Sequence, residues 1–438
     1  MRRDRALAVL AALLLALACG SEEPKTTTSN PPPEREPQPE ALGLVAPPMP
    51  DDLPRALVLS LAQFRDEGGK PVPGAARLEF LVRRGGAWHM TSLEDPESNV
   101  FHKAMAYGGG DAARLLSLGG TAAKVKLWSP GASGLTAQTI WEKDFGGKFS
   151  RMRDAEIGDL YGDGAASIAV ATHDQGVVAV LHPKGDTFEV VEYDTRPDTF
   201  VHEVEIGDLD GDGALEVYAT PSEPNRLDGT EQAGEVVRYV PSRGGERAVV
   251  AALGDRHAKE ILVADVDGDG RDELYVAVEG HVDANKVLVH PVEIRRYDAG
   301  TAPDAGQTIA TLKDRLTRFL TVGDVDGDGR KELVAATFSS GLWLLRPPVE
   351  PGGEWTTELI DADSKGFEHA SLLTDLDGDG KDELYVASDQ HKEVRRYAWT
   401  GQRLAREVIY IRPDDRPIFT WNLMAVPVGL AAPPTPTE

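Results

Sequence analysis

Cysteine and positive charge are both scarce in this chain of 438 residues. Cys19 is the only cysteine, which excludes an intramolecular disulfide and a cysteine-rich zinc site. The 46 lysines and arginines face 72 aspartates and glutamates, so the formal net charge is −26. Because phosphate contacts need surplus lysine and arginine, we expect no nucleic-acid partner.

Long apolar runs and catalytic signatures are missing as well. After residue 19, no segment has 18 consecutive apolar residues, and none keeps the 3.6-residue period of an amphipathic helix. The chain contains no G-x-S-x-G, H-E-x-x-H, P-loop or dinucleotide-binding signature. The sequence therefore predicts an all-β protein and assigns no catalytic residue.

Residues 1–18 have the anatomy of an export signal. Three arginines precede a wholly apolar stretch, residues 6–18, that is too short to cross a bilayer as a helix. The stretch ends in Ala16-Leu17-Ala18-Cys19, which resembles a bacterial lipoprotein signal, in which the cysteine carries the lipid after cleavage. We expect Cys19 to anchor an exported chain, by analogy in the outer membrane on its periplasmic or surface face. The alternative is an ordinary secretory signal with a chance cysteine.

Residues 19–50 are expected to be a disordered tether. Nine prolines among Ser, Thr and Glu fill residues 20–50, which can bury little apolar surface. A similar short tail is expected over residues 431–438. The folded domain is predicted to occupy residues 51–430 and to be monomeric.

Four copies of D-x-D-G-D-G-x-x-E are the most informative pattern, at residues 208–216, 265–273, 324–332 and 375–383. Positions 1, 3, 5 and 9 supply carboxylates, and the glycine at position 6 permits a left-handed turn. Calcium takes six to eight oxygen ligands, and crowding carboxylates without a cation costs Coulomb energy. An Asp-Gly hairpin turn without metal is the alternative. The pattern predicts about four calcium ions, with these ligands: Asp208, Asp210, Asp212, Glu216, Asp265, Asp267, Asp269, Glu273, Asp324, Asp326, Asp328, Glu332, Asp375, Asp377, Asp379 and Glu383.

A fifth copy, residues 159–167, is damaged. Asp159 and Asp163 remain, but Tyr161 and Ser167 replace the carboxylates at positions 3 and 9. We expect this loop to keep its turn and to bind metal weakly or not at all.

The loops recur with a period near fifty residues: their first aspartates are 49, 57, 59 and 51 residues apart. Around each loop, short β-branched and aromatic segments provide four strands, for example residues 261–264, 274–278, 292–297 and 308–312. Such a period with short strands predicts propeller blades.

Two further units complete the predicted ring. Residues 102–108 align without a gap with residues 202–208 but have lost the acidic loop. Residues 56–62, 78–82 and 88–93 supply three strands of one more blade, and residues 418–426 supply its first strand. The sequence thus predicts a seven-bladed propeller of four-stranded antiparallel blades, closed by strands from the two ends.

Residues 101–414 resemble the FG-GAP or VCBS repeats of integrin α-chains and bacterial surface proteins. The motifs that carry the resemblance are Gly207–Gly213, Ala264–Gly270, Gly323–Gly329 and Thr374–Gly380. In that family the loops join strands one and two on one face of the ring and hold calcium. The resemblance implies an architecture and a metal, but says almost nothing about activity.

A basic or imidazole residue lies six places before the first position of the acidic loop, or its aligned equivalent, in each of six repeats. These residues are His102, Arg153, His202, Lys259, Arg318 and His369. Because six residues of strand span about 20 Å, we expect them at the opposite end of the innermost strands, around the mouth of the channel. The loops between strands two and three should bring His173, His281, His391 and an insertion at residues 221–234 to the same face.

These residues predict a binding site for an anionic ligand, such as an acidic glycan or a protein carboxylate. We therefore expect a non-enzymatic binding, adhesion or scaffold module at the cell envelope. The alternative function is a polysaccharide lyase or hydrolase, in which His or Lys removes a proton beside a carboxylate that Arg neutralises. A transition-metal site and a wet channel mouth without function remain further alternatives.

Overall fold

The computed structural model describes residues 44–431, apart from residues 121–122, 133, 147–150, 173–174, 222–229, 351, 368 and 414–417. The predicted signal, Cys19 and residues 432–438 of the predicted tail lie outside the described residues. Within them, secondary structure is almost wholly β, with three short 3-10 turns, η1 (Gly110–Ala112), η2 (Pro241–Arg243) and η3 (Val428–Leu430). No helix in the described part has the length and hydrophobicity of a membrane span.

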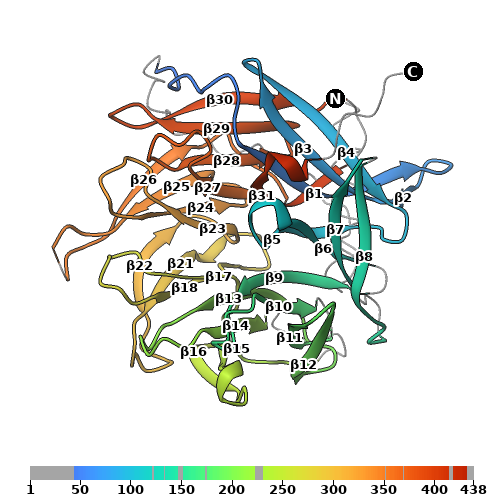
Figure 1. Cartoon of the computed structure of the whole chain (residues 1–438). Helices are drawn as coiled ribbons and strands as arrows, with labels where there is room; N and C mark the ends of the chain where they lie inside the picture. The colour runs from blue at the N-terminus through green and yellow to red at the C-terminus, as the bar shows by residue number, and fades with distance from the viewer. Residues whose placement is uncertain are drawn as a thin grey trace.

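Seven antiparallel sheets surround a central axis, with the first strand of each at the centre and the last at the rim (Figure 1). From inner to outer strand the blades are β31 (Ile418–Pro427), β1 (Arg55–Asp66), β3 (Ala76–Arg84), β4 (Ala87–Asp95); β5 (Phe101–Tyr107), β6 (Arg114–Gly119), β7 (Ala123–Gly131), β8 (Gly134–Lys143); β9 (Met152–Gly158), β10 (Ser167–Thr172), β11 (Val177–Lys184), β12 (Thr187–Thr195); β13 (Val201–Gly207), β14 (Glu216–Pro221), β15 (Gly234–Tyr239), β16 (Ala248–Gly254); β17 (Ala258–Ala264), β18 (Glu273–Val278), β21 (Val292–Tyr297), β22 (Gln307–Leu312); β23 (Thr317–Gly323), β24 (Glu332–Thr337), β25 (Leu342–Arg346), β26 (Thr356–Asp361); and β27 (Ser371–Thr374), β28 (Glu383–Ser388), β29 (Glu393–Trp399), β30 (Leu404–Ile411).

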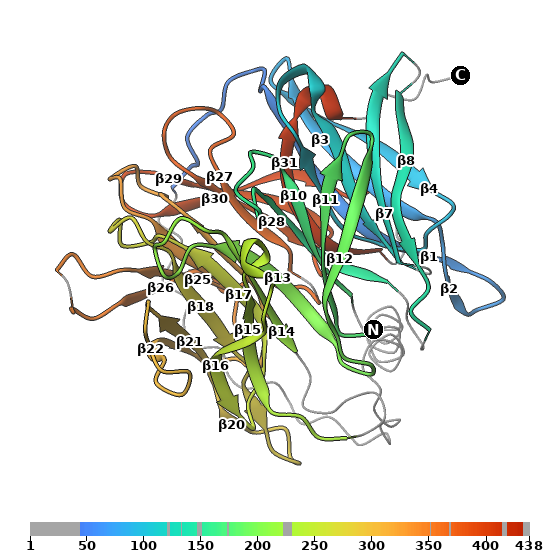
Figure 2. The ribbon, with the colours of Figure 1, turned by 60° about the horizontal axis from the view of Figure 1, so that its bottom comes forward.

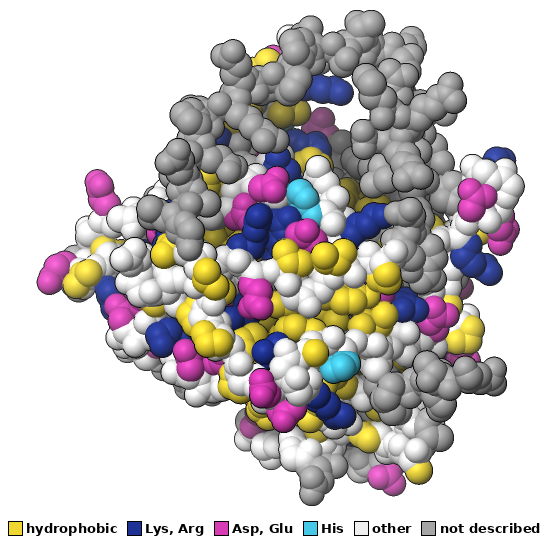
Figure 3. Space-filling view, turned by 90° about the horizontal axis from the view of Figure 1, so that it is seen from above, with side chains coloured by type: hydrophobic (Ala, Val, Ile, Leu, Met, Phe, Trp, Pro, Cys, Tyr) yellow, Lys and Arg dark blue, Asp and Glu magenta, His cyan; other side chains and the backbone are white. Residues whose placement is uncertain are grey.

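Two accessory pairings extend the blades. Strand β2 (Pro71–Pro73) pairs with the end of β1, and β19 (His281–Val282) pairs with β20 (Leu288–His290). Figure 2 shows β20 near the edge of the ring beyond β16. On the side seen in Figure 3, acidic and basic side chains alternate around a hydrophobic strip.

The ring closes as the sequence predicts. Strand β31, from the end of the chain, pairs antiparallel with β1, from Arg55 opposite Pro427 to Gln63 opposite Ile418. The predicted seven-bladed, four-stranded architecture is therefore confirmed. Closure leaves no blade without a neighbour.

The core lies between blades. The second strands β18 and β28 are buried at every residue, whereas the rim strand β22 has three exposed and three buried residues. Six tyrosines, two each from the β13, β17 and β27 blades, are among the largest fully buried side chains: Tyr218, Tyr239, Tyr275, Tyr297, Tyr385 and Tyr397. In these three blades, one tyrosine lies two residues after the start of the second strand, where the acidic loop ends.

Candidate metal loops and central channel

Each intact acidic loop joins the innermost strand of a blade to the second strand. Loop 265–273, for example, follows β17 and ends on Glu273, the first residue of β18. The glycines at position 6 have φ values of 85°, 88°, 87° and 86° in Gly213, Gly270, Gly329 and Gly380. An added Cβ would meet nothing within 4 Å there, so the backbone conformation and not space requires glycine.

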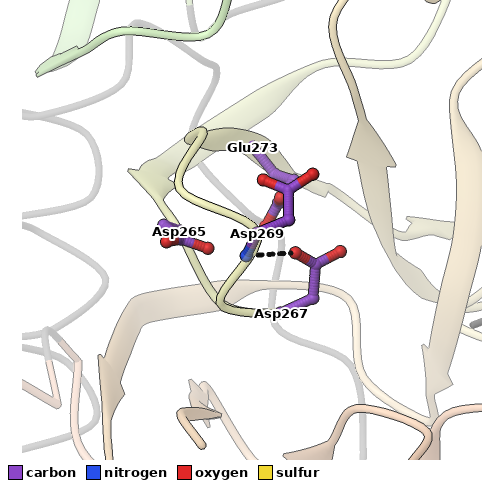
Figure 4. Close-up of side chains that lie close together, drawn as sticks. All are labelled: Asp265, Asp267, Asp269 and Glu273. Atoms are coloured by element: carbon purple, nitrogen blue, oxygen red, sulfur yellow. Dashed lines mark hydrogen bonds between the residues drawn. The ribbon is translucent and has the colours of Figure 1, made fainter. Parts of the chain in front are cut away.

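The carboxylates of each intact loop converge. In loop 265–273, all four acidic side chains offer oxygens within 4.8 Å of one another, as Figure 4 shows. The other loops bring together three each: Asp208, Asp210 and Asp212; Asp324, Asp326 and Glu332; Asp375, Asp377 and Asp379. The predicted ligands outside these groups are Glu216, Asp328 and Glu383.

One carboxylate oxygen in these loops has the environment expected of a cation ligand. The Oδ1 atom of Asp326 is buried and has no hydrogen-bond partner among the described residues. A buried, unpaired carboxylate oxygen costs free energy unless a cation or water satisfies it. The hard oxygen donors of the loop therefore fit a calcium ion.

The glutamate at position 9 also closes the base of its loop. Glu332 is 2% exposed, and its Oε2 atom accepts the N–H of Val325 at 3.0 Å. Glu216, Glu273 and Glu383 accept the matching N–H, and each also accepts the hydroxyl of the tyrosine two residues later. Burial raises the pKa of Glu273, Glu332 and Glu383 each to about 7. These glutamates are thus structural residues as well as candidate ligands.

An arginine from the third strand contacts the same carboxylates in every intact loop, and the sequence analysis missed it. The four are Arg238, Arg296, Arg346 and Arg396. Three of them directly precede a tyrosine, in the segments V-V-R-Y, I-R-R-Y and V-R-R-Y, a recurrence that an alignment of the third strands would have revealed.

The damaged loop keeps its turn, as predicted. Asp159 accepts the N–H of Asp163 at 3.0 Å and of Gly164 at 2.8 Å. The two replacement side chains bond elsewhere: the Tyr161 hydroxyl bonds to that of Tyr193, and Ser167 bonds to His182. The described residues of this loop form no convergent acidic group.

The intact loops are joined in two pairs. The Oδ2 atom of Asp272, at position 8 of its loop, accepts the N–H of Asp208 in the next blade at 2.7 Å. Asp382 accepts the N–H of Asp324 at 2.8 Å and donates its own N–H to the Asp324 carbonyl at 2.8 Å. Loop 208–216 is thus tied to loop 265–273, and loop 324–332 to loop 375–383.

The six predicted ring residues lie at the starts of the innermost strands, and five of them occupy β-bulges. In β13, Val201 pairs with Pro221 and Glu203 with Thr220, which leaves His202 as the extra residue. The same register shift falls at His102, Arg153, Lys259 and Arg318. His369 precedes β27 with a left-handed φ of 54°. A bulge re-aims its side chain, so the fold repeats one device around the channel.

The side chains of the six ring residues are largely buried, and not all of them are charged. Five of the six residues are buried, and Lys259 is half-buried. Arg153 donates to Nδ1 of His202 at 3.0 Å, so that nitrogen carries no proton. Burial, with Arg153 beside it, holds the pKa of His102 well below its usual value. The remaining fixed positive charges of the ring are Arg153, Lys259 and Arg318.

Trp421 is the seventh member of the ring and was missed. It is the bulged residue of β31, between Thr420, which pairs with Leu61, and Asn422, which pairs with Ser60. Its ring lies 5.0 Å from that of His102, and the Arg153 guanidinium lies 5.3 Å from its centroid. Trp421 precedes Pro427 by six residues, the same spacing as in the other blades, but no acidic loop follows to reveal it.

Carboxylates follow the ring along the inner strands. Lys103 Nζ lies 2.9 Å from Asp154 and 2.5 Å from Glu156. Burial first, and then neighbouring carboxylates, raise the pKa values of Glu203 and Glu205 well above the ordinary range. The basic ring is therefore adjacent to an acidic band on one side of the channel.

The other residues predicted at this face have mixed positions. His173 and most of the insertion lie outside the described residues. His281 is exposed, and His391 is half-buried. Nearby, Asp389 follows β28; its side chain is 8% exposed and accepts both the N–H and the hydroxyl of Thr420, at 2.7 and 2.8 Å. Asp389 therefore fixes β31 to its neighbouring blade.

Comparison with known proteins agrees with this architecture. Residues 265–335 match the model of the FG-GAP-like repeat, a stretch that includes the loops 265–273 and 324–332. The chain is a β-propeller with an FG-GAP-like repeat. No significant match was found among curated protein sequences.

Two solved structures resemble this propeller in fold. A proposed 6-phosphogluconolactonase from Bacteroides uniformis has a TM-score of 0.53 at 13% identity, covering 86% of this chain and 100% of that one. A protein from Lactobacillus plantarum has a TM-score of 0.51 at 13% identity, covering 85% of this chain and 99% of that one. At this identity the likeness concerns the fold alone.

Proposed function

We propose that the chain is a calcium-stabilised propeller that binds a ligand at the cell envelope without converting it. The observation that carries the calcium part is the convergence of carboxylates in four equivalent loops, with the buried Oδ1 atom of Asp326 lacking a partner among the described residues. Bound calcium would neutralise each loop and hold the connection between strands one and two. The first aspartate and the glutamate of each loop would supply two of its oxygens.

The basic ring is the proposed ligand site, and an acidic glycan or an acidic protein segment is its proposed ligand. Arg318 stacks on Phe367 at 5.3 Å, and Phe367 lies 6.4 Å from Trp421, so cationic and aromatic groups occur together. Such groups suit a carboxylate carried on a sugar ring or a peptide. The amino-terminal features support export and lipid attachment at Cys19, which would place this site at the membrane surface.

The proposal is tested first on the metal. Calcium should raise the melting temperature of the chain, EDTA should lower it, and elemental analysis should find about four calcium ions. An unchanged melt, together with the absence of calcium from the purified protein, would refute the calcium sites.

The ligand is tested by size-exclusion chromatography of acidic polysaccharides incubated with the calcium-loaded chain. Intact polymer that co-elutes with the protein, and that is lost in a K259Q/R318Q variant, is the expected result. Shortened polymer would instead indicate a lyase or hydrolase. The absence of both co-elution and shortening would reject the glycan and leave an acidic protein as the ligand to test.

A further inference from the structure

The third strand places one guanidinium beside the same two carboxylates of every intact loop. In loop 324–332, Arg346 Nη1 lies 2.7 Å from both Asp326 at position 3 and Glu332 at position 9. The matching pairs of distances, to positions 3 and 9, are 3.3 and 2.6 Å for Arg238, 2.6 and 3.3 Å for Arg296, and 3.6 and 2.8 Å for Arg396.

The damaged loop supplies an internal comparison. Where Tyr161 and Ser167 replace the two carboxylates, the third strand carries no arginine at this end. Val180 lies opposite Ala169, two residues after Ser167, which is the register of the arginine in three of the intact loops, and His182 contacts Ser167 itself. His182 Nδ1 bonds to Ser167 at 2.9 Å, and its Nε2 lies 3.2 Å from Asp163. The arginine is therefore lost together with the carboxylates at positions 3 and 9, which indicates that it belongs to the acidic loop and not merely to the blade.

We propose that this arginine is a resident cation of each calcium loop and sets its affinity for the metal; the inference rests on the calcium binding proposed above. Without metal, the guanidinium bridges positions 3 and 9 and offsets part of the repulsion among the crowded carboxylates. Calcium requires oxygens from the same two side chains. The ion must therefore share or displace the arginine contacts, which weakens calcium binding while the loop stays closed in its absence.

The hydrogen bonds of the loop glutamate show which of its oxygens the arginine and a calcium ion would compete for. In loop 265–273, the Oε2 atom of Glu273 already accepts the Val266 N–H at 3.1 Å and the Tyr275 hydroxyl at 2.9 Å. Its Oε1 atom, the one left for calcium, lies 3.3 Å from Arg296. The arginine and the incoming ion thus use the same side of the carboxylate.

Strand β21 offers a matched pair of variants for the test. Arg296 and Arg295 are adjacent, so their side chains project from opposite faces of the strand. Arg295 is 22% exposed and pairs with Glu293 at 2.7 Å, whereas Arg296 is 16% exposed and contacts the loop. The variants R296M and R295M each remove one paired guanidinium, and only the first removes it from a calcium loop.

The full-length chain and both variants should be melted in EDTA and in calcium, and titrated with calcium against a chromophoric chelator. We expect R296M to melt lower in EDTA than R295M and to recover with calcium. One of its calcium sites should tighten by about fivefold or more, the usual size of a coupling between competing ligands. R295M should keep the wild-type calcium affinities.

Two results would overturn the inference: a weaker calcium site in R296M, or an equal loss of melting temperature in EDTA and in calcium. Either would make Arg296 a plain structural clamp. If R296M does not fold in EDTA, the variant R296K, which keeps the charge without the planar fork, takes its place, and a tightened site remains the expected result. If the wild-type chain itself does not respond to calcium, the proposed calcium sites fail and this inference fails with them, whereas a wild-type response without the expected change in R296M overturns the inference alone.

Discussion

At the scale of single residues, His369 is neutral in the folded protein, although the sequence analysis selected it as one of six basic or imidazole residues. Its Nδ1 atom lies 2.8 Å from the carbonyl of Thr337, and its Nε2 atom lies 2.8 Å from the hydroxyl of Ser364. The carbonyl can only accept, so Nδ1 carries the proton and Nε2 accepts from the serine. Burial lowers the pKa of His369 to about 4.

A depressed histidine pKa makes stability depend on pH. Protonation favours the unfolded state, so the contribution of His369 is fully present above the unfolded pKa of about 6.5 and is lost as the pH falls towards 4. We expect the variant H369N to reduce the free energy of unfolding by about 1–3 kcal/mol at pH 7, because asparagine cannot make both of the buried hydrogen bonds that the imidazole makes. Its stability should fall less steeply than that of the wild type between pH 6.5 and 4.

Urea unfolding at a series of pH values measures this difference. Asparagine is the suitable replacement, because it tolerates the left-handed φ of 54° at this position. Comparison with the wild type separates the effect of His369 from that of Glu203 and Glu205. The raised pKa values of these two glutamates make stability increase as the pH falls, which is opposite to the effect of His369. Parallel profiles for the two proteins would contradict the assignment.

At the scale of elements, the pairing of loops explains why glycine directly precedes the first aspartate in only two of the four intact loops. A Cβ on Gly207 would lie 2.8 Å from the Asp272 carboxylate, and one on Gly323 would lie 2.6 Å from that of Asp382. The two loops whose own position 8 is aspartate begin with Ala264 and Thr374 instead. Glycine therefore occurs where a neighbouring loop must approach the backbone closely.

The bond between paired loops predicts that their calcium sites are coupled. Asp208 is a candidate ligand, and Asp272, which holds its backbone N–H, directly precedes the candidate ligand Glu273. Ordering either loop should therefore order the other. We expect D272A to lower the Hill coefficient of calcium binding and to weaken two sites by about fivefold, as measured by calcium titration.

The control for this prediction is a position 8 occupied by lysine, which has no carboxylate to accept the bond. K331A changes that position in loop 324–332 and should leave the titration unchanged, whereas D272N, which keeps an acceptor oxygen, should restore most of the coupling. An identical titration curve for D272A and K331A would show that the loops bind independently.

At the scale of the whole molecule, the closing strand completes the seventh blade. Strand β31 buries Leu423 and Val426 completely and Ile418 almost completely, and it supplies Trp421 to the channel. Burying three such side chains contributes about 5–9 kcal/mol, which equals much of the stability of an ordinary domain. Without β31, strand β1 would present an unpaired edge at the centre of the ring.

Removal of residues 418–438 should therefore abolish cooperative unfolding and cause aggregation. Truncation after residue 431, which spares β31 and η3, is the matched control and should melt like the full chain. Differential scanning calorimetry and light scattering distinguish the two. A cooperative, monomeric transition in the shorter variant would show that the closing strand is not required.

The sequence by itself determined the blades and the acidic loops. Both depend on local chemistry: a turn that needs glycine, carboxylates on alternate residues of one short loop, and a period long enough for four strands. It also determined the closure, because residues 56–62 and 418–426 each lacked partners that the other could supply.

Tertiary structure alone decided how the sites are completed. Arg346 meets Glu332 only because the third strand folds back on the second, and Asp272 meets Asp208 only because two blades are adjacent. Burial, which lowers the pKa of His369, depends on all the strands around the channel. Such contacts join residues from different strands and blades, so they follow from packing in three dimensions and not from any local pattern.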